Sequence, residues 1–156
     1  MKGSIDDYIR LLQDYKKQLR AKADLLARKL AEAGAEVVSV QYQVASYLGD
    51  KDVDVSVEER GPGSYAIVAS GQTVLILEFG AGVTFGYGHP EPGEYGPGTY
   101  PGQKHAMTGR GWYLPKSAGA HGGEHTYGNP PSAAMYYTAK SLREVIEQAA
   151  REVFGG

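Results

Sequence analysis

The chain has 156 residues, of which 42% are hydrophobic and 22% are charged, and this composition suits one soluble domain that buries a core. Its formal net charge of -2 gives no global basic field of the kind that attracts nucleic acid or an anionic membrane. It contains no cysteine, which excludes disulfides, thiolate zinc ligands and thiol catalysis.

The first segment predicts one long amphipathic helix. From Ile5 to Ala33, apolar residues recur at steps of three or four, which places them in one stripe. Ser4 can cap the start of this helix, and Gly34 can end it. A helix of roughly 30 residues is about 45 Å long, which exceeds the width of a small domain. We therefore expect part of the stripe to contact something outside its own core.

The second segment changes to a period of two, which predicts half-buried strands. Turn signals at 61–63 and 71–72 divide it into antiparallel neighbours. The prediction is a meander of about four strands, at residues 38–44, 53–58, 64–70 and 73–79. Residues 35–79 carry two Lys/Arg against seven Asp/Glu, so we expect an acidic sheet.

The last segment, residues 131–154, returns to helical spacing, and Pro131 suits its first turn. We expect this helix to pack on the sheet. The predicted fold is thus α+β, in a single domain over residues 1–156 with a loop or arm inserted at about 80–129.

The inserted segment 80–129 holds 14 of the 22 glycines and all four histidines, and neither period continues through it. Long irregular segments in compact domains are usually binding loops or disordered. Its many aromatic rings argue against plain disorder. We expect an arm that faces a partner and orders on contact.

One short motif in the arm, HGGEH at 121–125, matches a zinc metalloprotease pattern in its letters. That pattern works when a helix brings both histidines to one face, and Gly122 with Gly123 opposes a helix. We therefore assign no metal or cofactor to the chain. A metal-dependent hydrolase that uses His121, Glu124 and His125 remains an alternative hypothesis.

Glu78 stands within the apolar run VLILEFGAG, so part of its side chain should be buried. A buried carboxylate must find hydrogen-bond donors. We expect Glu78 to form an ion pair or backbone hydrogen bonds with a structural role.

Three segments in fixed order carry a resemblance to a known family: LEFGAG at 77–82, GRGWYLP at 109–115, and HTYGNPPSAAMYYTAK at 125–140. The chain resembles the small tail completion proteins of long-tailed phages, the gene-product-ten-like family of head-tail joining components. The residues that match the two motifs of that family are Glu78, Phe79, Gly80, Gly82, Gly128, Pro130 and Met135. Ala81 replaces a threonine, and Ala133 with Ala134 replaces a Pro-Phe pair. The resemblance implies a structural virion protein without enzymatic activity or cofactor.

From the residues and the resemblance together, we expect a ring of six identical subunits in the phage neck or tail. Its partners would be the head-tail connector and tail-tube or tail terminator proteins, and it would reside in the virion after assembly in the host cytoplasm. Asp52 and Asp54 would face the lumen and repel the phosphates of passing DNA, which would not bind specifically. The expected anchors for partners are Trp112, Tyr113, Tyr100 and Tyr127.

Two further expectations complete the prediction. The N-terminus has no apolar leader, and the longest aliphatic run, residues 74–77, is far too short to span a bilayer. We therefore expect a soluble chain that is not secreted by the signal-peptide route.

The second alternative to a virion subunit is a cellular module that binds peptide or glycan through Trp112 and the loop tyrosines.

Overall fold

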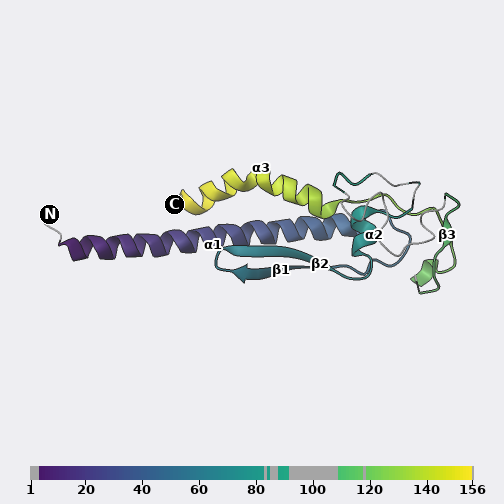
Figure 1. Cartoon of the computed structure of the whole chain (residues 1–156), viewed down its shortest axis with the longest axis horizontal. Helices are drawn as coiled ribbons and strands as arrows, with labels where there is room; N and C mark the ends of the chain where they lie inside the picture. The colour runs from purple at the N-terminus through teal and green to yellow at the C-terminus, as the bar shows by residue number, and fades with distance from the viewer. Residues whose placement is uncertain (1–3, 83, 85–87, 92–108, 118, 156) are drawn as a thin grey trace.

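The computed structural model describes residues 4–82, 84, 88–91, 109–117 and 119–155. It is an elongated α+β structure built along one long helix (Figure 1). The elements are α1 (Ile5–Val44), β1 (Asp54–Gly61), β2 (Ser64–Ser70), α2 (Val74–Phe79), β3 (Trp112–Tyr113), a 3-10 turn (Gly119–His121), β4 (His125–Thr126) and α3 (Ala134–Phe154). The predicted fold class is thus confirmed at this level, while the strand count is wrong.

The start of α1 was predicted correctly, and its end was not. Ser4 and Asp7 form a reciprocal capping box, in which the Ser4 side chain accepts from the Asp7 amide at 3.3 Å. The helix then continues through Gly34 to Val44, 40 residues in all. At 1.5 Å per residue this is about 60 Å.

The predicted strand at 38–44 is therefore the last part of α1. Its valines alternate with polar residues, but the structure buries them at a helical period. Val38 and Tyr42 are 0% and 2% exposed, whereas Val40 and Val44 are 57% and 77% exposed. Four apolar residues at a period of two are compatible with either element when only two of them become buried.

The two central predicted strands are confirmed as an antiparallel hairpin. β1 pairs with β2 in a register that sets Val55 opposite Ala69 and Val57 opposite Ile67. The turn between them is fastened to α1, because Asp24 accepts the amide of Gly63 at 2.8 Å and the hydroxyl of Tyr65 at 3.0 Å. The described chain has two such two-stranded sheets, β1 with β2 and β3 with β4, instead of one sheet of four.

The fourth predicted strand, 73–79, is the short helix α2. Its first turn closes with a hydrogen bond from the amide of Leu77 to the carbonyl of Thr73 at 2.9 Å. A short apolar run of this kind does not distinguish a strand from a buried helix. Here the run forms a helix, which buries the consecutive residues Leu77 and Glu78.

The C-terminal helix packs mainly on α1, and the prediction that it covers the sheet is wrong. In Figure 1, α1 runs between α3 and the hairpin. Gly34 lies at the meeting point of all three, since a Cβ there would be 2.5 Å from Cδ1 of Ile67 and 2.9 Å from Cδ1 of Leu142. The glycine expected to end α1 instead lets β2 and α3 approach it closely.

Along α1, only the second half contributes buried residues to the core. Val38, Tyr42, Leu77 and Ala134 form its buried centre, joined by half-buried side chains of the hairpin. Among the described residues, no helix is long and apolar enough to cross a membrane.

Candidate interaction surfaces

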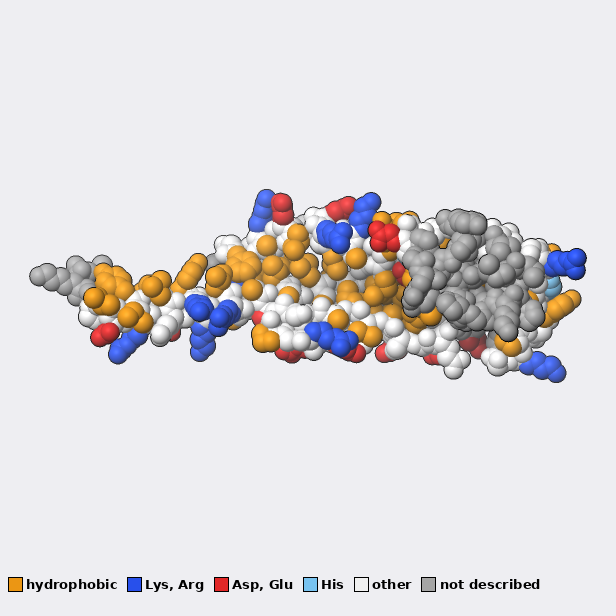
Figure 2. All heavy atoms as spheres, in the orientation of Figure 1, with side chains coloured by type: hydrophobic (Ala, Val, Ile, Leu, Met, Phe, Trp, Pro, Cys, Tyr) orange, Lys and Arg blue, Asp and Glu red, His pale blue; other side chains and the backbone are white. Residues whose placement is uncertain are grey.

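Residues 5–20, most of the first half of α1, are not covered by any other described element. This part of the helix projects beyond α3 and the hairpin (Figure 1), and every residue from 5 to 20 is exposed. Its apolar side chains include Ile5 at 78%, Tyr8 at 59%, Leu12 at 64%, Tyr15 at 61% and Leu19 at 45% exposed. These five follow a strict three-four spacing, the period that helices use to pack on another helix or in a groove. Figure 2 shows hydrophobic side chains along this projecting half.

Glu78 is the centre of the buried polar contacts. It is 6% exposed and accepts from the Tyr42 hydroxyl at 2.8 Å. It also accepts from the backbone amides of Met135 at 3.1 Å and Tyr136 at 3.4 Å, in the first turn of α3. His89 Nε2 lies 3.3 Å from Oε1 of Glu78. The expectation that donors hold this buried carboxylate is confirmed.

This carboxylate replaces a missing helix cap. The residue before α3 is Ala133, which has a left-handed backbone with φ of 48° and no side-chain oxygen to accept the free amides. Ser, Thr, Asp or Asn usually supplies that oxygen. Glu78 supplies it from α2, and its negative charge also suits the positive end of α3.

Tyr42 and His89 complete the surroundings of the carboxylate. Burial raises the pKa of the Tyr42 hydroxyl well above its ordinary value, and the charge of Glu78 and the hydrogen bond to it raise this pKa further. His89 Nδ1 accepts from the amide of Glu91 at 3.0 Å, so Nε2 is the nitrogen that carries the proton toward Glu78. Tyr42 thus donates to a carboxylate that also holds α3.

The motif residues that carry the family resemblance come together around this cap. Ala81 and Asn129 form an antiparallel bridge with both backbone hydrogen bonds at 3.0 Å. Gly82 and Gly128 flank the bridge, and a Cβ on Gly128 would be 1.8 Å from the carbonyl oxygen of Ala81. Pro130, next to Asn129, leads toward the start of α3. Sequence reasoning named these residues without indicating that they meet.

The HGGEH motif does not form a helix. His121 ends the 3-10 turn and lies 3.1 Å from Glu124, whereas His125 is in β4, with Nε2 3.1 Å from the carbonyl oxygen of Arg110. His89 lies with Glu78 in the buried cap. In the parts of the chain that the structure describes, no three His, Asp or Glu side chains are grouped so that they could hold a metal ion.

Three of the four expected aromatic anchors lie on or beside the β3-β4 ribbon, which sequence reasoning missed because each strand has only two residues. Tyr113 and Tyr127 are 71% and 53% exposed, and the ring of His125 stands edge-on between them with both centroid distances 5.0 Å. Trp112 is half-buried. Tyr100 lies outside the described residues.

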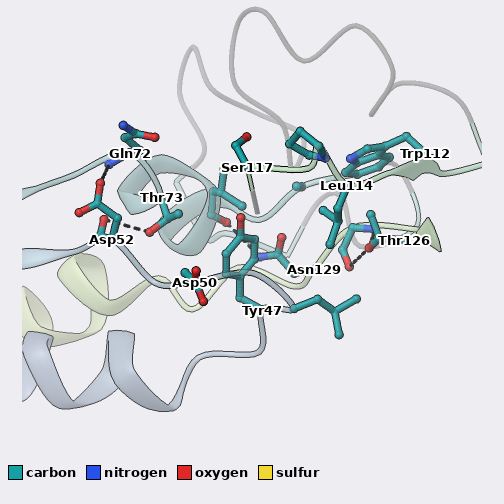
Figure 3. Close-up of a pocket in the computed structure, with 15 residues that line it drawn as sticks. Tyr47, Asp50, Asp52, Gln72, Thr73, Trp112, Leu114, Ser117, Thr126 and Asn129 are labelled. Atoms are coloured by element: carbon teal, nitrogen blue, oxygen red, sulfur yellow. Dashed lines mark hydrogen bonds between the residues drawn. The ribbon is translucent and has the colours of Figure 1, made fainter. Parts of the chain in front are cut away.

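Trp112 faces a cleft of about 450 Å³ between the ribbon and the α1-β1 connection (Figure 3). Asp50 and Asp52 line the same cleft. Asp52 accepts the Gln72 amide at 3.0 Å, so one of the two expected lumen carboxylates also fixes the turn before α2. Asp54 begins β1 and is exposed.

A second hollow, of about 440 Å³, lies between α1, β2 and α3, and we call it the α1-β2-α3 groove. Its lining is apolar except for Tyr65 and Thr138: Ala27, Leu30, Ala31, Val38, Tyr65, Ala66, Ile67, Met135, Thr138 and Ala139. Three segments far apart in sequence form it, so no local pattern could have revealed it.

Comparison of the chain with protein-family models, with curated proteins and with solved structures found no match.

Proposed function

We propose that the chain is a structural subunit of the neck or tail of a long-tailed phage, without catalytic activity or cofactor. It completes the tail at the head-tail interface as a ring of six copies. The observation that carries this proposal is the uncovered first half of α1. Five large apolar side chains stand at 45% exposure or more along it, and a contiguous exposed apolar stripe of this kind marks a surface for a partner.

The grouping of the resembling motifs supports the same function. Glu78, Gly82, Gly128 and Met135 belong to one structural centre that holds α2, the β3-β4 ribbon and the start of α3 together. A rigid assembly subunit requires residues that fix the relative positions of its elements, and these motif residues do so for three elements. This positioning role does not require a catalytic cleft.

The other surfaces have roles in this proposal. The exposed rings of Tyr113 and Tyr127, with Trp112 beside them, contact the head-tail connector, the tail tube or the tail terminator. Asp52 and Asp54 face the lumen and keep passing DNA unbound by repelling its phosphates. The finished ring resides in the virion, and its subunits are made in the host cytoplasm.

Gene disruption in the phage that encodes the chain tests the proposal. We expect full heads and separate tails that do not join, and restoration of joined particles by the wild-type chain. The Leu12→Glu chain should fail to restore them because it places a charge in the apolar stripe. The Gln13→Glu chain, with the same charge one residue away and off the stripe, should restore them.

Three results would overturn the proposal. Joined, infectious particles without the gene would exclude a role in tail completion. A purified chain that binds stoichiometric zinc and hydrolyses a substrate, or a permanent monomer that binds peptide or glycan, would favour the alternative functions.

A further inference from the structure

The α1-β2-α3 groove has the shape and lining of a binding site for apolar side chains. Four of the residues that line it are alanines, Ala27, Ala31, Ala66 and Ala139, and these leave space between the larger elements. The volume of about 440 Å³ is enough for several large side chains. β2 pairs with β1 on one side only, so its other edge has no partner strand among the described residues.

One polar group of the lining residues is enclosed and has no hydrogen-bond partner within the described residues. Thr138 is 2% exposed, and its Oγ1 is the one buried side-chain oxygen or nitrogen in the described chain without a hydrogen-bond partner. A buried hydroxyl without a partner destabilises the folded chain. Because this oxygen is enclosed in the free chain, the surface that the groove offers to an occupant is apolar.

The first half of α1 has this chemistry. Its stripe alternates aliphatic and aromatic residues, with Tyr8 and Tyr15 between Ile5, Leu12 and Leu19. A tyrosine places an apolar ring in a groove and a hydroxyl at the end of it. Tyr8 or Tyr15 can thus fill space beside the alanines of the groove and keep its hydroxyl at the rim.

Charge favours the same pairing. Residues 5–20 of α1 carry four basic side chains against three acidic, Arg10, Lys16, Lys17 and Arg20 against Asp6, Asp7 and Asp14, and all four basic ones fall within residues 10–20. The hairpin that forms one wall of the groove, residues 54–70, carries three acidic side chains against one basic, Asp54, Glu58 and Glu59 against Arg60. The basic stretch 10–20 gains from electrostatic complementarity beside an acidic hairpin.

The stripe cannot reach the groove of its own chain. Leu12 and Ala31 are 19 residues apart on one continuous helix, or about 28 Å at 1.5 Å per residue. The occupant must be another molecule, and a second copy offers the matching helix. Two different patches that match each other give a head-to-tail contact, which forms rings when the rotation closes.

We propose that the first half of α1 of one copy docks in the α1-β2-α3 groove of the next copy, with Leu12 and its neighbouring tyrosines between β2 and α3. This inference rests on the proposed function only in taking copies of the chain to assemble with one another.

Cysteine cross-linking tests the contact directly, because the natural chain has no cysteine. A chain with Leu12→Cys and Ala139→Cys should form a ladder of disulfide-linked oligomers under mild oxidation. The matched control is Leu12→Cys with Glu144→Cys. Glu144 is exposed and lies at least about 120° around α3 from the groove residues Met135, Thr138 and Ala139, at 100° per residue, so it faces away from the groove. The ladder should be at least about tenfold stronger in the first chain, a difference of about 1.4 kcal/mol.

A mixing experiment gives an independent readout. Leu12→Glu damages the helix of a copy and leaves its groove intact, whereas Ala139→Trp fills the groove and leaves the helix intact. Each variant alone should stay monomeric in analytical ultracentrifugation, with self-association weakened by about 30-fold or more. An equimolar mixture should form a dimer with one copy of each, because one intact helix meets one intact groove.

Three results would overturn the inference. One is a ladder of equal strength in the Glu144 control, and another is a mixture that remains monomeric. The third is efficient cross-linking of Leu12→Cys alone, which would show that the helices pair with each other; gene disruption would then still decide the proposed function separately.

Discussion

At the scale of single residues, Glu78 joins three elements that the sequence places far apart. It lies on α2, receives the hydroxyl of Tyr42 from α1, and accepts two backbone amides of α3. Charged acceptors form the stronger hydrogen bonds in proteins. One carboxylate therefore links α1, α2 and the start of α3.

Removal of this carboxylate is the first prediction. Glu78→Ala should lower the free energy of unfolding by about 1 to 3 kcal/mol, because the Tyr42 hydroxyl and two amides lose their acceptor. Urea denaturation followed by circular dichroism would measure the loss. Glu36→Ala, which removes an exposed glutamate of α1, is the control and should change stability by less than about 0.5 kcal/mol. Equal midpoints for the two variants would contradict the role of Glu78.

The raised pKa of Tyr42 predicts a pH dependence of stability. The pKa in the folded chain lies above the ordinary value of 10.0, chiefly because the hydroxyl is buried. The folded state thus keeps this proton while the unfolded state loses it, so the stabilisation is complete below pH 10 and falls as pH rises above it. The loss is at most about 1.4 kcal/mol per pH unit from this group.

Urea titrations from pH 8 to 11 on wild-type, Tyr42→Phe and Tyr8→Phe chains would measure this effect. Tyr42→Phe should show a shallower decline than wild type above pH 10. Tyr8→Phe removes an exposed tyrosine and should follow wild type. Parallel curves for all three chains would show that Tyr42 ionises equally in both states.

The unpaired hydroxyl of Thr138 gives a third prediction. Thr138→Val should raise the free energy of unfolding of the monomer by about 1 kcal/mol, since it removes a buried polar group that has no partner. Thr126→Val is the matched control, because Thr126 is also buried but its Oγ1 accepts the Gly128 amide at 3.0 Å. That variant should be destabilised. A loss of stability in Thr138→Val would mean that its hydroxyl is satisfied in solution.

At the scale of elements, the sequence predicted the type of an element where its pattern was long or its turn chemistry specific. The capped start of α1, the hairpin with its Gly-Pro-Gly turn, and the helical spacing of α3 are correct. The errors fall on residues 38–44 and 73–79, where short apolar runs are compatible with both helix and strand. Tertiary burial decided both in favour of helix.

The candidate surfaces divide in the same way. An overlong helix with an apolar stripe, and a buried Glu78 in need of donors, could be inferred from local sequence alone. The identity of those donors could not be inferred, because Tyr42 and Tyr136 lie 36 and 58 positions from Glu78 in the sequence. The α1-β2-α3 groove could not be inferred either, because three distant segments form it. Long-range contacts of this kind leave no periodic signal.

The contact at Gly34 gives a prediction for the packing of α1, β2 and α3. Gly34→Leu should cost about 1 to 3 kcal/mol, because a side chain there overlaps Ile67 and Leu142. Part of this cost is offset by the better helix propensity of leucine, about 1 kcal/mol. Ala33→Leu, one residue away and exposed, should be close to neutral in the same urea titration. If Gly34→Leu were equally neutral, the three elements would not meet as closely as the structure shows.

At the scale of the whole molecule, folding and assembly use different halves of α1. The buried positions of this helix are Ala31, Gly34, Val38 and Tyr42, whereas every residue from 5 to 20 is exposed. Substitutions in the first half should therefore leave the folded monomer unchanged, and substitutions in the core should unfold it. The same Leu→Ala substitution, made once at an exposed position of the first half and once in the core, can therefore distinguish the residues that serve assembly from those that serve folding.

Leu12→Ala and Leu77→Ala form this pair. Leu12 is 64% exposed and its loss should change monomer stability by less than about 0.5 kcal/mol, whereas Leu77 is 0% exposed and its loss should cost about 2 to 5 kcal/mol. Any contact that forms only between folded copies stabilises the folded state by mass action, so the Tm of the wild-type chain should rise with protein concentration.

This dependence on concentration distinguishes the two variants in one set of thermal scans. Leu12→Ala should match the wild-type Tm in dilute solution and gain less at high concentration. Leu77→Ala should melt at a lower temperature throughout, while its Tm still rises with concentration because its stripe is intact. A wild-type Tm that does not depend on concentration would contradict self-association of the isolated chain. A loss of stability in dilute Leu12→Ala would show that the first half of α1 contributes to the fold of the monomer itself.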